Sequence, residues 1–271
     1  MILIIKRVVL ASVLVLLSIS AFAQKKWVKN GEWYFSWGYN KEWYTKSTIH
    51  VDQPNLNSSY AFQRVSANDH IGWDQLFQHD LSIPQYNYRL GYFFNEKQDW
   101  GIEINFDHTK YVVEQGSTVN IKGKVAGMAV DTNVVINDKI LLYQLNNGAN
   151  FLLFNIVKRT NIHTSKSENY RLDFLGKLGI GPVIPHVENT ILGNKNTPHF
   201  QFGGWNTGFE MALRAVFYKH YYIEYANKID YASYSGLRIY QGTAKQDFIC
   251  YQLILSAGVC FGGGKIGKTT N

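Results

Sequence analysis

The chain has 271 residues, of which 46% are apolar, 15% aromatic and 17% charged, with a formal net charge of +7. This positive excess is small and dispersed, so it gives no reason to expect nucleic-acid binding. The high aromatic content favours β-strands. After residue 23 no run approaches the roughly 18 apolar residues of a membrane-spanning helix, which excludes a helical membrane protein.

The start of the chain has the pattern of a secretion signal. Lys6 and Arg7 form a charged region, Val8–Ile19 an apolar one, and Ala21-Phe22-Ala23 a small-x-small cleavage site. The apolar run is too short to span a bilayer as a helix. We therefore predict cleavage after Ala23, which leaves 25 basic residues against 20 acidic ones. The predicted domains are a signal peptide at 1–23, a β-barrel at 24–262 and a flexible tail at 263–271.

Apolar and polar residues alternate with a period of two along eight segments, which is the pattern of β-strands with two unlike faces. The fourth is the least regular: Phe151, Leu153 and Val157 fall on its apolar face, while Leu152 and Phe154 are expected to face inward. Cys250 and Cys260 lie ten residues apart in the eighth segment, too far for a disulfide along an extended strand. The eight segments are Gly31–Asn40, Gln85–Asn95, Trp100–Asp107, Tyr143–Val157, Tyr170–Gly181, Trp205–Phe217, Tyr221–Tyr231 and Ile249–Gly262.

The connections between the segments alternate in length. Those at 95–99, 158–169 and 219–220 are the shorter ones, and 41–84, 112–142, 185–200 and 232–247 are longer. Short turns on one side and long loops on the other are typical of outer-membrane barrels with both termini in the periplasm. The first two long loops contain further strand patterns, at 44–51 with 60–66 and at 118–126 with 129–136.

The polar faces of the segments suggest the interior of a narrow barrel and not a solvated sheet. They are rich in glycine and carry balanced charges, which must pair with one another where water is scarce. A soluble β-sandwich, the alternative, would place its apolar face inside. We predict a lumen ion network that leaves no open pore, with Arg89–Glu103 and Arg214 with Glu210 or Glu224 as pairs. Its predicted members are Arg89, Glu103, Asp107, Arg171, Asp173, Lys177, Glu210, Arg214, Glu224 and Lys228.

Aromatic residues stand at the ends of the apolar faces, where outer-membrane barrels carry girdles at the two membrane interfaces. We expect a periplasmic girdle of Trp33, Phe94, Trp100, Tyr170, Phe217, Tyr221 and Phe261, and an outer girdle of Tyr39, Tyr86, Tyr143, Trp205, Tyr231 and Tyr251.

The export signal, eight strands, aromatic girdles and polar interior resemble the small outer-membrane barrels of the OmpA/OmpX type. The resemblance covers residues 31–262 and implies an all-β, eight-stranded antiparallel up-and-down transmembrane barrel in the outer membrane of a Gram-negative cell. It also implies lipid as a partner. The chain continues past Phe261 to Asn271, a departure from a barrel that ends on its final-strand aromatic residue.

Three stretches match patterns of chemical sites. Residues 262–269 match the P-loop pattern, but only two residues follow Thr269, too few to build the helix that would hold phosphate. Gln144-Leu145-Asn146-Asn147-Gly148 faintly resembles the His-x-Ser-Asn stretch of lipid A 3-O-deacylases, with Gln144 and Asn146 in place of the base and the nucleophile. Asp107-His108 could form a dyad only across a bulge, because strand neighbours point to opposite faces.

The leading functional hypothesis is therefore a non-enzymatic, monomeric surface barrel whose loops serve adhesion, envelope integrity or ligand capture, with 41–84 and 112–142 as the ligand-binding loops. No catalytic residue, cofactor, metal site or nucleic-acid partner is predicted. A lipid-modifying enzyme, with His108 on the lipid side near the outer rim, is one alternative. A narrow transporter of small apolar ligands is another.

Overall fold

The computed structural model describes residues 31–69, 85–94, 99–145 and 148–262. Nearly all of them form antiparallel strands, and the one helical element is a short 3-10 turn, η1, at Pro54–Leu56. No helix in these ranges is long and apolar enough to cross a membrane. The strands are β1 (Glu32–Tyr44), β2 (Ser47–Gln53), β3 (Ser58–Val65), β4 (Ala67–Asn68), β5 (Tyr86–Phe93), β6 (Trp100–His108), β7 (Tyr111–Val113), β8 (Thr118–Val125), β9 (Met128–Val135), β10 (Leu141–Leu145), β11 (Phe151–Thr164), β12 (Tyr170–Val183), β13 (His186–Ile191), β14 (Asn194–Lys195), β15 (His199–Phe200), β16 (Gly204–Phe217), β17 (Tyr221–Ile239) and β18 (Gly242–Gly262).

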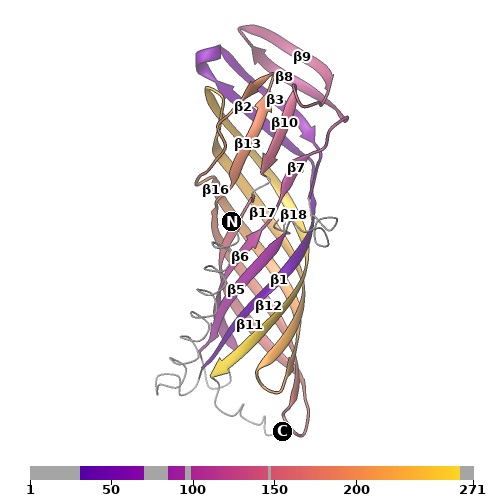
Figure 1. Cartoon of the computed structure of the whole chain (residues 1–271), viewed down its shortest axis with the longest axis vertical. Helices are drawn as coiled ribbons and strands as arrows, with labels where there is room; N and C mark the ends of the chain where they lie inside the picture. The colour runs from indigo at the N-terminus through magenta and orange to yellow at the C-terminus, as the bar shows by residue number, and fades with distance from the viewer. Residues whose placement is uncertain (1–30, 70–84, 95–98, 146–147, 263–271) are drawn as a thin grey trace, which may run out of the picture.

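A closed barrel occupies the lower half of the molecule in Figure 1. Its eight strands pair in the order β1, β5, β6, β11, β12, β16, β17 and β18, and β18 pairs back onto β1 from Glu32↔Gly262 to Tyr44↔Cys250. Each strand is antiparallel to both neighbours, and sequential barrel strands are adjacent. This confirms the predicted all-β, antiparallel up-and-down barrel, and the ring closes with the expected eight strands.

Above the barrel, the long connections fold into a second β-structure, which we call the head (Figure 1). On one side β2 pairs with the upper end of β18, β3 pairs with β2, β8 with β3, and β9 with β8. On the other side β4 pairs with the upper end of β1, β7 with β4, β10 with β7, and β13 with β10. The strand patterns expected in the first two loops are therefore confirmed as β2 with β3 and β8 with β9.

The inward face of the sheet is polar in the barrel and apolar in the head, and the outward face changes in the opposite sense. Strand β18 shows both arrangements along its length. Among its barrel residues, Ser256 and Gln252 face inward while Leu255 faces outward. Nearer the head, Phe248 faces inward and Lys245 outward. The barrel is thus polar inside and apolar outside, as in a bilayer, whereas the head has the apolar core and polar surface of a protein in water.

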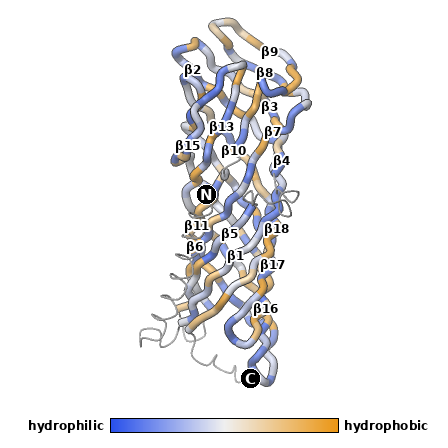
Figure 2. The backbone as a smooth tube through the Cα atoms, in the orientation of Figure 1, coloured by the Kyte–Doolittle hydropathy of each residue, from blue (hydrophilic) through white to orange (hydrophobic). Residues whose placement is uncertain are grey.

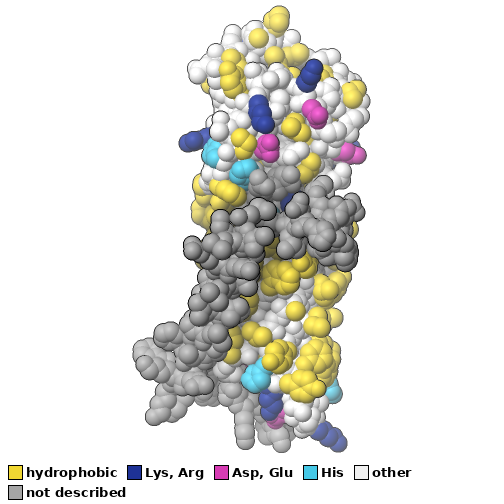
Figure 3. Space-filling view, in the orientation of Figure 1, with side chains coloured by type: hydrophobic (Ala, Val, Ile, Leu, Met, Phe, Trp, Pro, Cys, Tyr) yellow, Lys and Arg dark blue, Asp and Glu magenta, His cyan; other side chains and the backbone are white. Residues whose placement is uncertain are grey.

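The outer surface follows the same division. Apolar side chains gather over the barrel half in Figure 3, whereas charged side chains appear mainly on the head and at the lower turns. Along the backbone tube of Figure 2, hydrophobic and hydrophilic positions are interspersed within the strands. The head buries one large apolar cluster that includes Ile49, Phe62, Leu141 and Leu237. A smaller cluster around Phe93 and Leu175 lies inside the barrel.

The fourth predicted segment was wrong in two respects. It divides into β10, which belongs to the head, and β11, which belongs to the barrel. In β11 the inward and outward faces are also opposite to those expected: Phe154 and Ile156 are 54% and 59% exposed, whereas Leu153 is fully buried. Phe151 and Leu153 point inward because they belong to the large apolar cluster of the head, so apolar residues at this end of β11 do not mark its lipid-facing side.

Two other predicted boundaries were also wrong. The connection at 232–247 is not a loop, because β17 and β18 continue through it to the turn at Tyr240 and Gln241. A register shift between Tyr234 and Leu237, with Gly236 at a φ of 64°, interrupts the ladder once and lets the hairpin bend. The expected turn at 158–169 is likewise shorter, because β11 runs on to Thr164.

Candidate functional site

A network of buried charges fills the middle of the barrel, and Lys177 is its centre. Its Nζ lies 2.9 Å from Glu103 Oε2, 3.0 Å from Glu210 Oε1 and 2.9 Å from Glu224 Oε1. These groups come from β6, β12, β16 and β17, so the lysine links four strands across the lumen. Charges so far from water need such partners, because an unpaired buried ion costs several kcal/mol, about 3–5.

Two arginines complete the centre of the network. Arg89 Nη1 donates to both carboxylate oxygens of Glu210, at 2.8 and 2.7 Å, and lies 3.8 Å from Glu103. Arg214 Nε donates to Glu224 Oε2, and Arg214 Nη2 also lies 2.6 Å from that oxygen. The structure thus brings Arg89 close to Glu103 but within hydrogen-bonding distance of Glu210, and of the two candidates for Arg214 it selects Glu224.

Aromatic rings and glycines shape the space around Arg214. Its guanidinium lies 4.1 Å from the ring of Tyr34 and 4.2 Å from that of Tyr222, within cation–π range of both. The rings fit because glycines face them: an added Cβ would lie 2.1 Å from Tyr34 Cζ at Gly91 and 2.4 Å from Tyr222 Cζ at Gly258. The glycines of the polar face therefore make room for large side chains in a narrow lumen.

The network continues toward both ends of the barrel. At the lower end Glu32 accepts from Arg159 and lies 3.2 Å from Arg171, which is 2.7 Å from Asp173. At the upper end Lys228 donates to Asp107 and lies 3.2 Å from Asp230, and Arg89 Nη2, 3.8 Å from Asp107, joins this set to the centre.

All ten side chains predicted for the lumen network are buried inside the barrel. Arg159 is an addition that sequence reasoning missed, because the predicted fourth strand ended at residue 157. Glu32 and Asp230 were already placed on polar faces of their segments. Extending the predicted alternation two residues further would have placed Arg159 on the outward face with Val157, so the reversed faces of this segment also hid it.

An aromatic cluster in the head covers the upper end of the lumen. Phe248 stacks on Tyr111 with ring centroids 4.8 Å apart, on Tyr234 at 5.5 Å, and meets Tyr44 edge-on at 5.3 Å. Tyr143 joins Tyr111 edge-on at 6.5 Å. Tyr143 is fully buried here, so its predicted place in the outer girdle was wrong: β10 belongs to the head, and its residue faces the core.

Hydroxyl groups of the cluster are tied to the surrounding strands. Tyr111 Oη and Ser47 Oγ are 2.9 Å apart, and Tyr234 Oη donates to the carbonyl oxygen of Ala149 at 2.9 Å. Burial raises the pKa of Tyr111 to about 12 and has the same effect on Tyr60 in β3. Both side chains therefore keep their hydroxyl protons at physiological pH.

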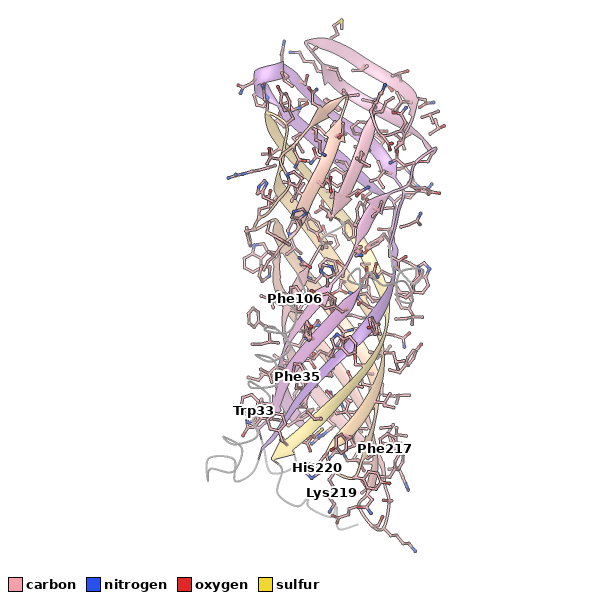
Figure 4. The ribbon with its side chains drawn as sticks, viewed as in Figure 1. Trp33, Phe35, Phe106, Phe217, Lys219 and His220 are labelled. Carbon is pink, nitrogen blue, oxygen red and sulfur yellow. The ribbon has the colours of Figure 1, made fainter. Side chains whose placement is uncertain are left out.

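The other predicted girdle residues lie on or near the outer surface. Trp100, Phe94, Phe217 and Tyr221 are exposed at the lower end, as Trp205 and Tyr231 are at the upper end of the barrel, whereas Trp33, Tyr39, Tyr86, Tyr170, Tyr251 and Phe261 are partly buried. Figure 4 places Trp33 and Phe217 near the lower end and Phe106 well above them.

The structure does not assemble the candidate catalytic groups. Asp107 pairs with Lys228, whereas His108 Nδ1 lies 2.9 Å from Asn150 Oδ1 and its ring stacks on Tyr86 at 4.6 Å. The two neighbours therefore form no dyad, and His108 is buried, not presented to lipid as the enzyme alternative requires.

The remaining sequence motifs give no site either. Gln144 lies half-buried in β10, while residues 146–147 and 263–269 are outside the described residues. The described ranges contain no group of three His, Cys, Asp or Glu side chains that could hold a metal ion. Cys250 and Cys260 are both free thiols, as predicted.

Comparisons with known proteins give structural similarities only. No protein-family model matches the chain, and no curated protein matches it by sequence. Among solved structures, it is similar to the outer membrane protein OprG from Pseudomonas aeruginosa (12% identity, 86% of this chain and 97% of that chain, TM-score 0.40). It is also similar to the attachment invasion locus protein Ail of Yersinia pestis (13% identity, 86% of this chain and 99% of that chain, TM-score 0.32). A third similar structure is the outer membrane protease OmpT from Escherichia coli (11% identity, 88% of this chain and 99% of that chain, TM-score 0.37).

Because each of these TM-scores lies below 0.5, nothing about the activity of this chain follows from them. The barrel itself carries the assignment of the fold. Its strand pairing closes a ring, its exterior is apolar and its interior is filled by paired charges. The chain is an antiparallel up-and-down β-barrel with the architecture of the small outer-membrane barrel proteins.

Proposed function

We propose that the protein is a sealed outer-membrane anchor that carries a rigid β-structured head outside the cell, where the head binds partners by contact. The observation that supports this proposal most is a reversal of polarity along the continuous strands β17 and β18. Their outward face is apolar in the barrel and polar in the head. An apolar exterior suits lipid, and a polar exterior over an apolar core suits water, so one chain is adapted to both surroundings.

The direction of the chain agrees with this orientation. β1 begins and β18 ends at the barrel end opposite the head (Figure 1). Barrels of this kind have short periplasmic turns and longer extracellular segments, so the head is assigned to the outside. Export through the predicted signal peptide, with cleavage after Ala23, remains a prediction that N-terminal sequencing of the mature protein can test.

A sealed barrel should not conduct ions. The lumen contains the Lys177 network and, above it, the aromatic cluster around Phe248. We therefore expect the purified protein, reconstituted in planar bilayers, to produce no stepwise conductance, while a general porin measured in the same bilayers does. Regular conductance steps that scale with protein added would contradict the proposal and would favour the transporter alternative.

The lipid-facing position of the barrel surface can be tested with matched methionines. Met211 lies in the middle of β16 and is 47% exposed, and Met128 in the head is 71% exposed. In lipid vesicles, Met211→Arg should reduce the free energy of unfolding by about 2–4 kcal/mol, because the cation must enter hydrocarbon.

Met128→Arg, the control, should change the free energy of unfolding by no more than about 0.5 kcal/mol, because its side chain is in water. Unfolding in urea followed by tryptophan fluorescence measures both variants. Equal effects of the two substitutions would argue against a membrane around the barrel.

A further inference from the structure

The strand β9, Met128–Val135, is a free edge of the head. It pairs with β8 along its whole length, from Val125↔Met128 to Thr118↔Val135, and with no other described strand. It is drawn as the uppermost strand in Figure 1. An unpaired edge presents backbone N–H and C=O groups to any strand that can add to it. Natural edges usually carry proline or several charges that prevent this, but β9 has no proline and one charge, Asp131.

The turn before β9 determines which backbone groups are free. Ala126 and Gly127, with φ angles of 49° and 85°, form a two-residue turn, so Val125 and Met128 exchange hydrogen bonds across it. Bonding direction alternates along an antiparallel strand, so every second residue after Met128 also faces β8. The residues that direct their N–H and C=O groups toward the free edge are Ala129, Asp131, Asn133 and Val135.

The sequence of β9 is complementary to itself in one register. Two copies can pair antiparallel about a two-fold axis perpendicular to the sheet, and residues opposite each other then lie on the same face. Because side chains alternate between faces, opposite residues are an even number of positions apart in sequence. One residue is therefore opposite its own copy, and the axis lies between the two. An axis through Asp131 would set two carboxylates against each other, which is unfavourable. An axis through Thr132 pairs threonine with threonine and gives three further pairs, which are Val130 with Val134, Asp131 with Asn133 and Ala129 with Val135 of the second copy.

This register satisfies the backbone and the side chains together. The pairs Ala129 with Val135 and Asp131 with Asn133 join residues whose backbone groups are free, so their hydrogen bonds can form across the new edge. On the other face, Val134 already packs against the apolar core of the head, and Val130 of the second copy would extend that apolar surface. The only charged side chain meets an amide, which can donate to it.

We propose that β9 is a self-association site, at which two copies of the chain join their heads into one continuous antiparallel sheet centred on Thr132. The contact is strand addition at a sheet edge, with the same strand contributed by both partners. It replaces the monomer predicted from the sequence and gives the surface-binding role proposed above a specific partner, a second copy of the chain.

Disulfide trapping tests both the pairing and its register. In the proposed dimer the two Thr132 residues are directly opposite at a non-hydrogen-bonded position, where Cα atoms lie about 4.5 Å apart. That is within the range of a disulfide, so Thr132→Cys should give a dimer on mild oxidation, seen as a band of twice the mass on a non-reducing gel. Native Cys250 and Cys260 are buried and should not react.

The control is Asp131→Cys, one residue away and likewise exposed to solvent. Its two copies would be offset by two residues along the strand and would lie on different strands, which separates their Cα atoms by about 8 Å. This exceeds the roughly 7 Å that a disulfide can bridge, so the variant should stay monomeric. Adding Asn133→Pro to Thr132→Cys should abolish the dimer, because proline removes a free-edge N–H but none that bonds β8. Heat-dependent migration on the gel verifies that each variant is folded.

A dimer with Thr132→Cys that is lost in the other two variants supports the proposal. Equal cross-linking at residues 131 and 132, or no dimer from folded Thr132→Cys at any protein concentration tested, would overturn it. Either result is independent of the conductance measurement, so failure of this contact and failure of the sealed-anchor proposal can be told apart.

Discussion

Lys177→Met should lower the free energy of unfolding by about 3–5 kcal/mol, the typical cost of leaving buried charge without its partner. The methionine fills a similar volume, so the loss is electrostatic and not a matter of packing. Among the described residues, Glu103, Glu210 and Glu224 would then keep only Arg89 and Arg214 as cationic partners within ion-pair distance. Urea unfolding of the protein folded into lipid vesicles, followed by tryptophan fluorescence, gives the difference.

Lys219→Met is the matched control for this variant. Lys219 pairs with Glu168 at 3.0 Å near the lower turns, where both side chains are largely exposed to water. Such surface ion pairs contribute little, at most about 1 kcal/mol. If Lys177→Met were no more destabilising than Lys219→Met, the lumen charges would have access to water and the barrel would not be sealed.

Phe248→Ala should destabilise the head by about 3–5 kcal/mol, because it opens a cavity among closely packed rings. The side chain contacts Tyr44, Tyr111 and Tyr234, and those ring contacts are lost as well. Phe248 lies in β18, which continues into the barrel, so we expect the loss to appear in the unfolding of the whole protein.

Phe200→Ala provides the comparison at an exposed phenylalanine of the head, where about 0.5 kcal/mol or less is expected. Protease sensitivity of the head in intact vesicles gives an independent measurement. A Phe248→Ala protein that resists unfolding and proteolysis as well as the Phe200→Ala protein would show that the aromatic cluster is not a core.

The sequence predicted the barrel well because its strands face lipid on one side and a crowded lumen on the other. This produces strict alternation, and segments such as Trp100–Asp107 show it without exception. The alternation failed at the upper end of β11, where the inward residues Phe151 and Leu153 are apolar because they belong to the core of the head. The sequence alone does not distinguish them from lipid-facing residues.

The head was harder to predict because its pattern is the same alternation with the opposite meaning. Tyr143 lies on the apolar side of its segment, as a lipid-facing residue would. However, β10 lies above the barrel, where apolar residues point inward. The choice of ion pairs was also beyond the sequence. Arg89 and Glu210 are 121 residues apart, and only the tilt and register of eight strands bring them together.

The continuous β17–β18 hairpin has a mechanical consequence. It runs from the lower end of the barrel into the head, so no flexible linker separates the two along these strands. A pull on the head would load the backbone ladders of this hairpin along the strands, in shear, and many hydrogen bonds would resist at once. The head would therefore pass force to the membrane as a stiff lever and would hold a fixed angle to the cell surface under tension.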